Sequence, residues 1–228
     1  MRQYRPDNNE RRAPNLWLHR NPKLEPGTNP GNQGTSSALI VQNLKGRGEP
    51  RNAPILKVFM FYGTIKKFDV ADGEGVRVSL FVSGCRNCCT GCFQPQTWDF
   101  NFGNEFTEET QNEIIKALEP PHIQGFSLLG GEPFEPENQQ VLAPFLKKLK
   151  EIYPKKDIWC WTGYIFEKDL QPGGKRYIPE YTELMLNCID VLVDGPFIQE
   201  KKNLMLRFRG SENQRLLHLK DGEIQKIE

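Results

Sequence analysis

Four cysteines lie within eight consecutive residues, and this cluster limits what the chain can be more than any other feature. The loop reads Ser83-Gly84-Cys85-Arg86-Asn87-Cys88-Cys89-Thr90-Gly91-Cys92-Phe93 and directly follows a predicted strand. A strand end in a βα unit faces the ligand-binding side of an α/β sheet. So many thiols in one such loop indicate a metal or redox centre rather than side chains that fill a core.

Two sets of ligands are compatible with this loop. In the first, all four thiols form a zinc site, paired as Cys85 with Cys88 and Cys89 with Cys92. The adjacent side chains of Cys88 and Cys89 point apart, however, and zinc knuckles separate their cysteine pairs by a longer spacer. The second set uses Cys85, Cys89 and Cys92, which can hold three irons of a four-iron cluster and leave the fourth iron without a protein ligand. Cys88 is then a spare thiol. A redox-active disulfide is a third interpretation, but it needs fewer thiols.

Bulk composition excludes several classes of function. The formal net charge is +1, which gives no electrostatic argument for binding nucleic acid or an anionic membrane. The sequence contains no apolar run long enough to span a bilayer, and its beginning lacks the apolar stretch of a signal peptide. We therefore expect a cytoplasmic protein, in which clustered thiols stay reduced and serve as metal ligands or catalysts.

The composition changes near residue 60. Residues 1–59 hold repeated Asn-Pro, Pro-Gly and Gly-Asn steps and almost no periodic apolar pattern, so we expect a disordered extension. Two interpretations stay open for it. The native protein could start at Met60, with the preceding residues translated from an upstream start in error, or the extension could be a genuine basic tail. Residues 60–228 are predicted to form the catalytic domain.

Strand and helix patterns alternate along the predicted domain. Strands are expected at residues 61–70, 76–83, 125–129, 158–161 and 191–193, and helices at 107–118, 137–152 and around 181–186. Residues 205–208 are a candidate further strand. Strands that alternate with helices form parallel βαβ units. The repeats are too few for a complete eight-stranded barrel, so the predicted fold is α/β, a partial, open β/α barrel or short parallel sheet.

The three-then-two spacing of Cys85, Cys89 and Cys92, followed by the aromatic Phe93, resembles the radical S-adenosylmethionine (radical SAM) superfamily. A Gly130-Gly131-Glu132-Pro133 element follows the next predicted strand, where members of that superfamily carry a Gly-Gly-Glu element. By this resemblance, the backbone of Gly130 and Gly131 meets the amino group of SAM. Glycine allows such a close approach, and the Glu132 carboxylate could accept from an ammonium group.

The resemblance narrows further with four later segments. They are Trp98 after the cysteine loop, then Trp161-Thr162-Gly163-Tyr164, Val193-Asp194-Gly195-Pro196-Phe197 and Arg209-Gly210-Ser211-Glu212-Asn213-Gln214. In this order they are similar to the activating proteins of anaerobic ribonucleoside-triphosphate reductase, over about residues 61–217. Pro196 and Leu129 depart modestly from the family pattern.

The resemblance implies a function, cofactors and partners. A 4Fe-4S cluster on Cys85, Cys89 and Cys92 would cleave SAM to a 5′-deoxyadenosyl radical, which abstracts hydrogen from a glycine of the reductase. Gly91, Cys92, Phe93, Gly130, Gly131 and Glu132 would line the SAM pocket. The radical chemistry belongs to the cofactor, so no side chain is needed as acid or base. The reductase large subunit would be the protein substrate, with a flavodoxin or ferredoxin as electron donor.

Rival interpretations remain open. The chain could activate another glycyl-radical enzyme, such as the pyruvate formate-lyase type, although extra ferredoxin-like cysteines are absent. It could also be a small-molecule radical SAM enzyme or a non-catalytic zinc module. A basic patch of Lys201, Lys202, Arg207, Arg209 and Arg215 is either a solvated face or a docking surface for an acidic partner or a nucleotide-binding protein.

Overall fold

The computed structural model describes residues 58–228. Residues 1–57 lie outside the described part. The expectations for the extension at residues 1–59 therefore stay predictions. Within the described part, no helix has the length and apolar character needed to cross a membrane.

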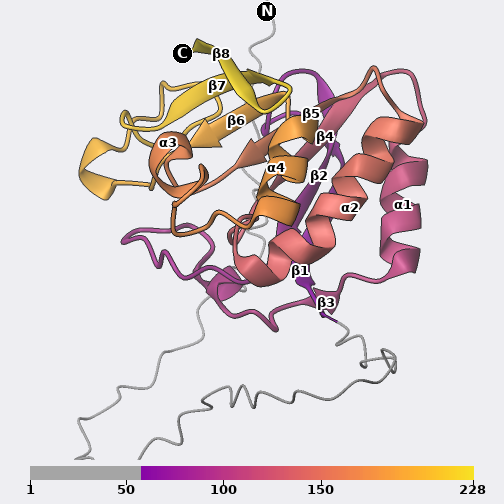
Figure 1. Cartoon of the computed structure of the whole chain (residues 1–228), viewed down its shortest axis with the longest axis horizontal. Coiled ribbons are helices and arrows are strands. Elements are labelled where there is room, and N and C mark those ends of the chain that lie inside the picture. Colours follow the sequence, from indigo (N-terminus) through magenta and orange to yellow (C-terminus); the bar gives the residue numbers. More distant parts are fainter. Residues whose placement is uncertain (1–57) are drawn as a thin grey trace, which may run out of the picture. The chain divides into compact units, whose positions relative to one another are not determined.

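The described residues build an α/β fold around one mixed eight-stranded sheet in the order β3-β1-β2-β4-β5-β6-β7-β8 (Figure 1). The strands are β1 (Phe61–Asp69), β2 (Val76–Val82), β3 (Asn104–Glu105), β4 (Ile123–Gly130), β5 (Asp157–Trp161), β6 (Val191–Asp194), β7 (Arg215–Lys220) and β8 (Glu223–Ile227). The four central strands β2, β4, β5 and β6 are parallel, and the outer pairs are antiparallel. The sheet is not closed, because β3 and β8 are its two edges.

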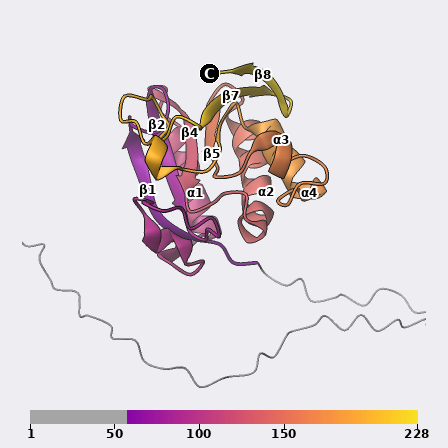
Figure 2. The same ribbon diagram turned by 90° about the vertical axis from the view of Figure 1, so that its left-hand side faces the viewer.

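The helices α1 (Glu108–Leu118), α2 (Pro136–Ile152) and α4 (Pro179–Cys188) connect the parallel strands, and a short α3 (Phe166–Asp169) follows β5. In Figure 2, α2 and α4 lie on one side of the sheet. Alternate residues of each strand, such as Val78 and Leu80, are buried beneath the helices in the main core. Thr107 begins α1 as predicted, since its side chain accepts a hydrogen bond from the backbone N–H of Thr110.

The opposite face of the sheet carries a second, smaller apolar cluster. Trp159, Val191, Val193 and Leu216 form it, and Trp161 and Phe208 pack against it. The segment after β6, drawn in orange and yellow in Figure 2, crosses this face. Residues of this cluster and of the crossing segment, among them Trp161 and Phe208, line the pocket described below.

The prediction of a strand at residues 205–208 is wrong. These residues form a turn, in which the Asn203 side chain accepts a hydrogen bond from the backbone N–H of Met205 at 2.9 Å. The final strands are instead β7 and β8, which pair as an antiparallel hairpin around Asp221-Gly222. An Asp-Gly step between two apolar runs is a strong hairpin signal that sequence reasoning could have used.

Candidate functional site

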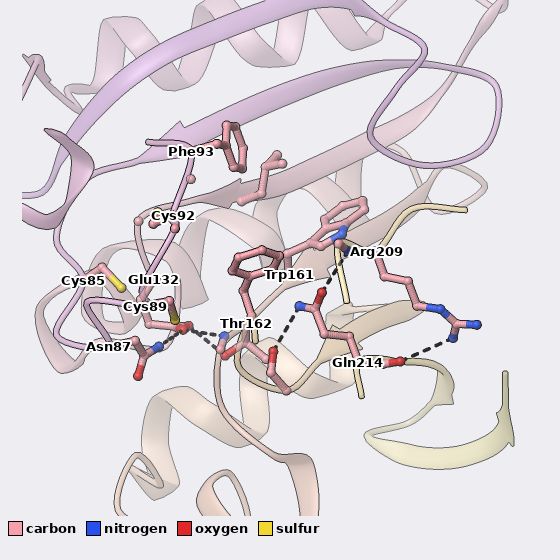
Figure 3. A pocket seen from close by; sticks show the side chains of 18 of the residues that line it. Cys85, Asn87, Cys89, Cys92, Phe93, Glu132, Trp161, Thr162, Arg209 and Gln214 are labelled. Carbon is pink, nitrogen blue, oxygen red and sulfur yellow. Dashed lines mark hydrogen bonds between the residues drawn. The ribbon is translucent and has the colours of Figure 1, made fainter. Parts of the chain in front are cut away.

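A pocket of about 550 Å³ opens where the parallel strands reach their carboxyl ends. The ends of these four strands and the loops after them all contribute to its lining. They supply Cys85, Cys89 and Cys92 after β2, Gly130 at the end of β4 with Gly131 and Glu132 after it, Trp161 at the end of β5 with Thr162 and Gly163 after it, and Gly195 and Phe197 after β6. The pocket also extends to Asp72 in the turn between β1 and β2. Figure 3 shows the three cysteines on one side of the pocket and Trp161, Arg209 and Gln214 on the other.

All the residues that the sequence singled out for the cluster and for SAM line this one pocket. Gly91 takes a left-handed backbone conformation, with φ at +76°, and a side chain there would collide with Oε1 of Gln199 at 2.1 Å. Phe93 is 82% exposed at the edge of the pocket. The structure therefore brings together residues that lie up to 47 positions apart in the sequence.

Cys88 differs from its three neighbours. It is exposed and has a φ of +45°, in the left-handed region that residues other than glycine rarely adopt. Its thiol contacts the backbone oxygen of Cys85 at 3.8 Å. Cys85, Cys89 and Cys92 are partly buried and line the pocket. This division matches the three-thiolate set rather than the pairing of all four thiols.

The donor set fits an iron–sulfur cluster. Three thiols on one wall of a pocket offer the soft ligands that such clusters take, and each thiolate binds a different iron. Within residues 58–228, no three His, Cys, Asp or Glu side chains are placed to share a single metal ion. Burial raises the pKa of Cys85 to about 12, with a further rise from the charge of Glu132, and burial also raises the pKa of Cys89. Ligation would therefore release protons from these thiols.

Glu132 borders the pocket, but its carboxylate is bonded to groups of the protein itself. It is 1% exposed, and its carboxylate accepts hydrogen bonds from the backbone N–H groups of Phe134 (3.0 Å) and Gly163 (2.8 Å). It also accepts from the Thr162 hydroxyl (2.8 Å) and the Asn87 amide (3.0 Å). Burial raises the pKa of Glu132 to about 7, against these hydrogen bonds, which lower it. One carboxylate thus ties the cysteine loop to the ends of β4 and β5, an arrangement that we call the Glu132 latch.

The two glycines before Glu132 allow the latch to form. A side chain on Gly131 would lie 2.7 Å from the backbone oxygen of Gly84 and 3.0 Å from that of Thr97. Gly130 has a φ of +110°, which other residues rarely adopt. The N–H of Gly131 donates to Val82, and the N–H of Glu132 donates to Gly84. These two N–H groups therefore already have partners within the protein. The amino group of a ligand is itself a hydrogen-bond donor, so it would contact carbonyl oxygens of this segment rather than its N–H groups.

A second carboxylate, that of Glu135, also holds the beginning of the cysteine loop, at the residue before Asn87. Glu135 is fully buried and accepts from both the backbone N–H (2.9 Å) and the guanidinium (2.6 Å) of Arg86. The Tyr164 hydroxyl donates to the same carboxylate at 3.0 Å, and Arg176 lies 3.3 Å from it. Glu137 completes the grip on the Arg86 side chain at 2.6 Å. Sequence reasoning missed these contacts, because only the three-dimensional fold brings Arg86 to the beginning of α2.

The later motifs close the far side of the pocket. Trp161 donates from its ring N–H to the backbone oxygen of Phe208 at 2.7 Å. Gln214 accepts from the backbone N–H of Gly210 (2.9 Å) and donates to the backbone oxygen of Gly195 (3.1 Å). These hydrogen bonds join the segment after β6 to the ends of β5 and β6. Residues of the three motifs that are far apart in the sequence thus contact one another in the structure.

Comparison with known proteins identifies the family. A family model described as a 4Fe-4S single cluster domain matches residues 71–217. The anaerobic ribonucleoside-triphosphate reductase-activating protein of Haemophilus influenzae is 42% identical over 148 residues, which cover 64% of this chain and 90% of the relative. The proteins of the same name from Escherichia coli K12 (37% identity, 71% of this chain, 100% of the relative) and phage T4 (39%, 72% and 97%) are also similar.

The chain belongs to the family of anaerobic ribonucleoside-triphosphate reductase-activating proteins. The resemblance seen in the sequence is thereby confirmed. The match to the 4Fe-4S model spans the cysteine loop, the Glu132 latch and the pocket walls up to β7. In this activating protein, the pocket is therefore part of the matched iron–sulfur domain.

Loss of the latch should loosen the cysteine loop. We expect Glu132→Gln to lower the free energy of unfolding by about 2 kcal/mol, because an amide donor would face groups that are themselves donors. Backbone amides of residues 85–92 should then exchange with solvent faster, as measured by hydrogen–deuterium exchange mass spectrometry. Glu113→Gln is the matched control, since the Glu113 carboxylate is 48% exposed on α1 and pairs with Lys67 on β1 rather than with the cysteine loop. Equal exchange in the two variants would contradict the latch.

Proposed function

We propose that this chain holds one 4Fe-4S cluster on Cys85, Cys89 and Cys92 and activates anaerobic ribonucleoside-triphosphate reductase by SAM-dependent formation of a glycyl radical. When bound and reduced, such a cluster supplies the electron that splits SAM into methionine and a 5′-deoxyadenosyl radical. The deoxyadenosyl radical would take a hydrogen atom from the Cα of one reductase glycine, to give 5′-deoxyadenosine and the glycyl radical. A flavodoxin or ferredoxin would supply the electron in the cytoplasm.

The observation that carries the proposal is the placement of the thiols. Cys85, Cys89 and Cys92 line a pocket together with the Gly130-Gly131-Glu132 segment, whereas Cys88 is exposed. The relatives are named as activating proteins of this reductase, and the matched domain is described as carrying a 4Fe-4S cluster. An open sheet with a pocket at its carboxyl ends supports the proposal that the fold is a partial barrel of the radical SAM type.

The chain's own residues would hold and orient the cofactors. Glu132 and Glu135 hold the adjacent residues Asn87 and Arg86 at the beginning of the cysteine loop, and the thiols of Cys85, Cys89 and Cys92 line the pocket. The backbone of Gly130 and Gly131 would accept hydrogen bonds from the amino group of SAM, and Gly91, Cys92 and Phe93 line the same pocket. A side chain that moves a proton is not required, because hydrogen transfer to carbon is a radical step.

Anaerobic reconstitution tests the cofactor part of the proposal. The protein would be loaded with iron and sulfide, reduced with dithionite and examined by electron paramagnetic resonance with and without SAM. We expect the signal of one reduced 4Fe-4S cluster, which changes shape when SAM is added. A protein that takes up no cluster and holds one zinc ion tightly would overturn the proposal.

A further inference from the structure

A loop at residues 201–209, here called the 201–209 loop, is firmly anchored on the uncovered face of the sheet. Lys202 pairs with Ser211 in a backbone bridge, and the N–H of Asn203 donates to Gly210 at 3.1 Å. At the other end, the backbone oxygen of Phe208 accepts a hydrogen bond from the ring N–H of Trp161 at 2.7 Å. The Phe208 ring also packs edge-on against the Trp159 ring, with the ring centroids 5.0 Å apart. The loop is therefore held at both ends.

The tip of this anchored loop displays large apolar side chains. Met205 is 89% exposed and Leu204 is 86% exposed. Together with Phe93, at 82%, they are the three most exposed large apolar side chains among residues 58–228. Leu204 and Phe93 both line the main pocket, and Met205 lines a neighbouring hollow of about 440 Å³. Exposed apolar side chains gathered at one site are typical of a surface that binds another protein.

Charge defines the partner that would fit. Residues 199–209 contain four basic residues and one acidic residue. Arg209 is used internally, since it donates to the backbone oxygen of Glu228 at 2.6 Å. Lys201 and Lys202 are exposed, and Arg207 has a 3.5 Å contact with Glu74 in which both side chains are largely exposed and the attraction is weak. A complementary partner segment would carry acidic residues.

The basic patch predicted from the sequence is therefore smaller in the folded chain. Arg215 does not belong to it, because its guanidinium bonds the buried Asp194 at 2.5 Å and Glu167 at 2.7 Å. What remains accessible is Lys201, Lys202 and Arg207, next to the two apolar side chains at the tip. The cations and the apolar side chains come from one short loop beside the thiol pocket.

From this arrangement, we propose that the 201–209 loop is the docking surface for the reductase segment that carries the acceptor glycine. The segment would place apolar side chains against Leu204 and Met205 and acidic side chains against Lys201, Lys202 and Arg207. This inference rests on the proposed function. Because Leu204 borders the same pocket as Cys85, Cys89 and Cys92, a segment bound there lies beside the site of radical formation.

Titration of the purified reductase large subunit onto the cluster-loaded protein tests the docking surface. The Leu204→Ser, Met205→Ser double variant should bind the reductase about tenfold more weakly. Phe68→Ser is the matched control, because Phe68 is 72% exposed on β1 and stacks with His122, outside the two pockets described. Binding by the double variant that stays within about twofold of the parent would overturn the proposal.

A second pair of variants tests the electrostatic part. Lys201→Glu combined with Lys202→Glu should weaken binding and reduce its dependence on salt, because attraction between exposed charges is screened by ions. Lys155→Glu is the control, since this exposed lysine lies just before β5 at the amino ends of the parallel strands. Unchanged salt dependence in the double variant would overturn this part.

SAM cleavage by the parent protein alone tests the proposed function separately. The binding titrations test the docking surface, whatever the result of the SAM cleavage assay.

Discussion

Cys89→Ala should lose the cluster, whereas Cys88→Ala should keep it. The two cysteines are adjacent, yet Cys89 is partly buried and lines the pocket, while Cys88 is exposed and has its thiol near a backbone oxygen. Mutation of a residue that only contacts a metal ligand typically lowers the affinity for the metal by roughly 10- to 100-fold. Removal of a cluster ligand itself should lower the affinity for the cluster by more than this. Iron and acid-labile sulfide, measured after anaerobic reconstitution and desalting, check the expectation.

The pair of variants is its own control for folding. Each replaces one thiol by a hydrogen atom, and the left-handed conformation at position 88 is equally available to Cys and Ala because both carry a Cβ. Similar melting temperatures of the cluster-free proteins would show that any difference in iron comes from ligation. An equal loss of iron in both variants would contradict the three-thiolate set and favour a site that uses all four.

Arg77→Met should be the most destabilising single substitution outside the cluster. Arg77 is completely buried on β2, where its guanidinium donates to the Asp157 carboxylate (2.6 Å), the Ser127 hydroxyl (2.7 Å) and the backbone oxygen of Phe126 (2.8 Å). Burial lowers the pKa of Arg77, and the charge of Asp157 opposes this effect. The substitution leaves these partners without their donor, so we expect a loss of about 3–5 kcal/mol in the free energy of unfolding.

Urea unfolding of the Arg77→Met protein, compared with a surface control, measures this effect. Lys67→Met removes an ion pair with Glu113 at 2.8 Å, in which both side chains are about half exposed, and should cost less than about 1 kcal/mol. Arg77 also donates to the backbone oxygen of Glu74, in the turn that brings Asp72 to the pocket. Similar losses in the two variants would show that burial of the guanidinium contributes little.

The sequence predicts the central elements because their patterns are local. The strand at Val76–Val82, predicted from its β-branched and aromatic residues, and the Thr107 cap depend on neighbours within a few positions, and both appear in the structure. The Glu132 latch depends instead on Asn87 and Gly163, which lie 45 and 31 positions away. Pairing over such distances depends on the order of strands in the sheet, and a single sequence does not reveal it.

The error at residues 205–208 has a similar origin. The segment contains large apolar side chains that suit a strand, but the Asn203 side chain holds it in a turn, and its exposed apolar side chains have no layer above them in the described structure. Glu132 illustrates the same limit at the site. It lies where the sequence placed it, yet its carboxylate binds four groups of the protein itself.

The central claim is radical transfer to the reductase, and one measurement tests it most directly. The reduced, cluster-loaded protein would be incubated anaerobically with SAM and the reductase large subunit, then frozen for electron paramagnetic resonance while 5′-deoxyadenosine is quantified. We predict a glycyl-radical doublet on the reductase, with about one 5′-deoxyadenosine formed per radical, and neither product with Cys89→Ala. Formation of 5′-deoxyadenosine without any reductase radical would contradict the proposed activation.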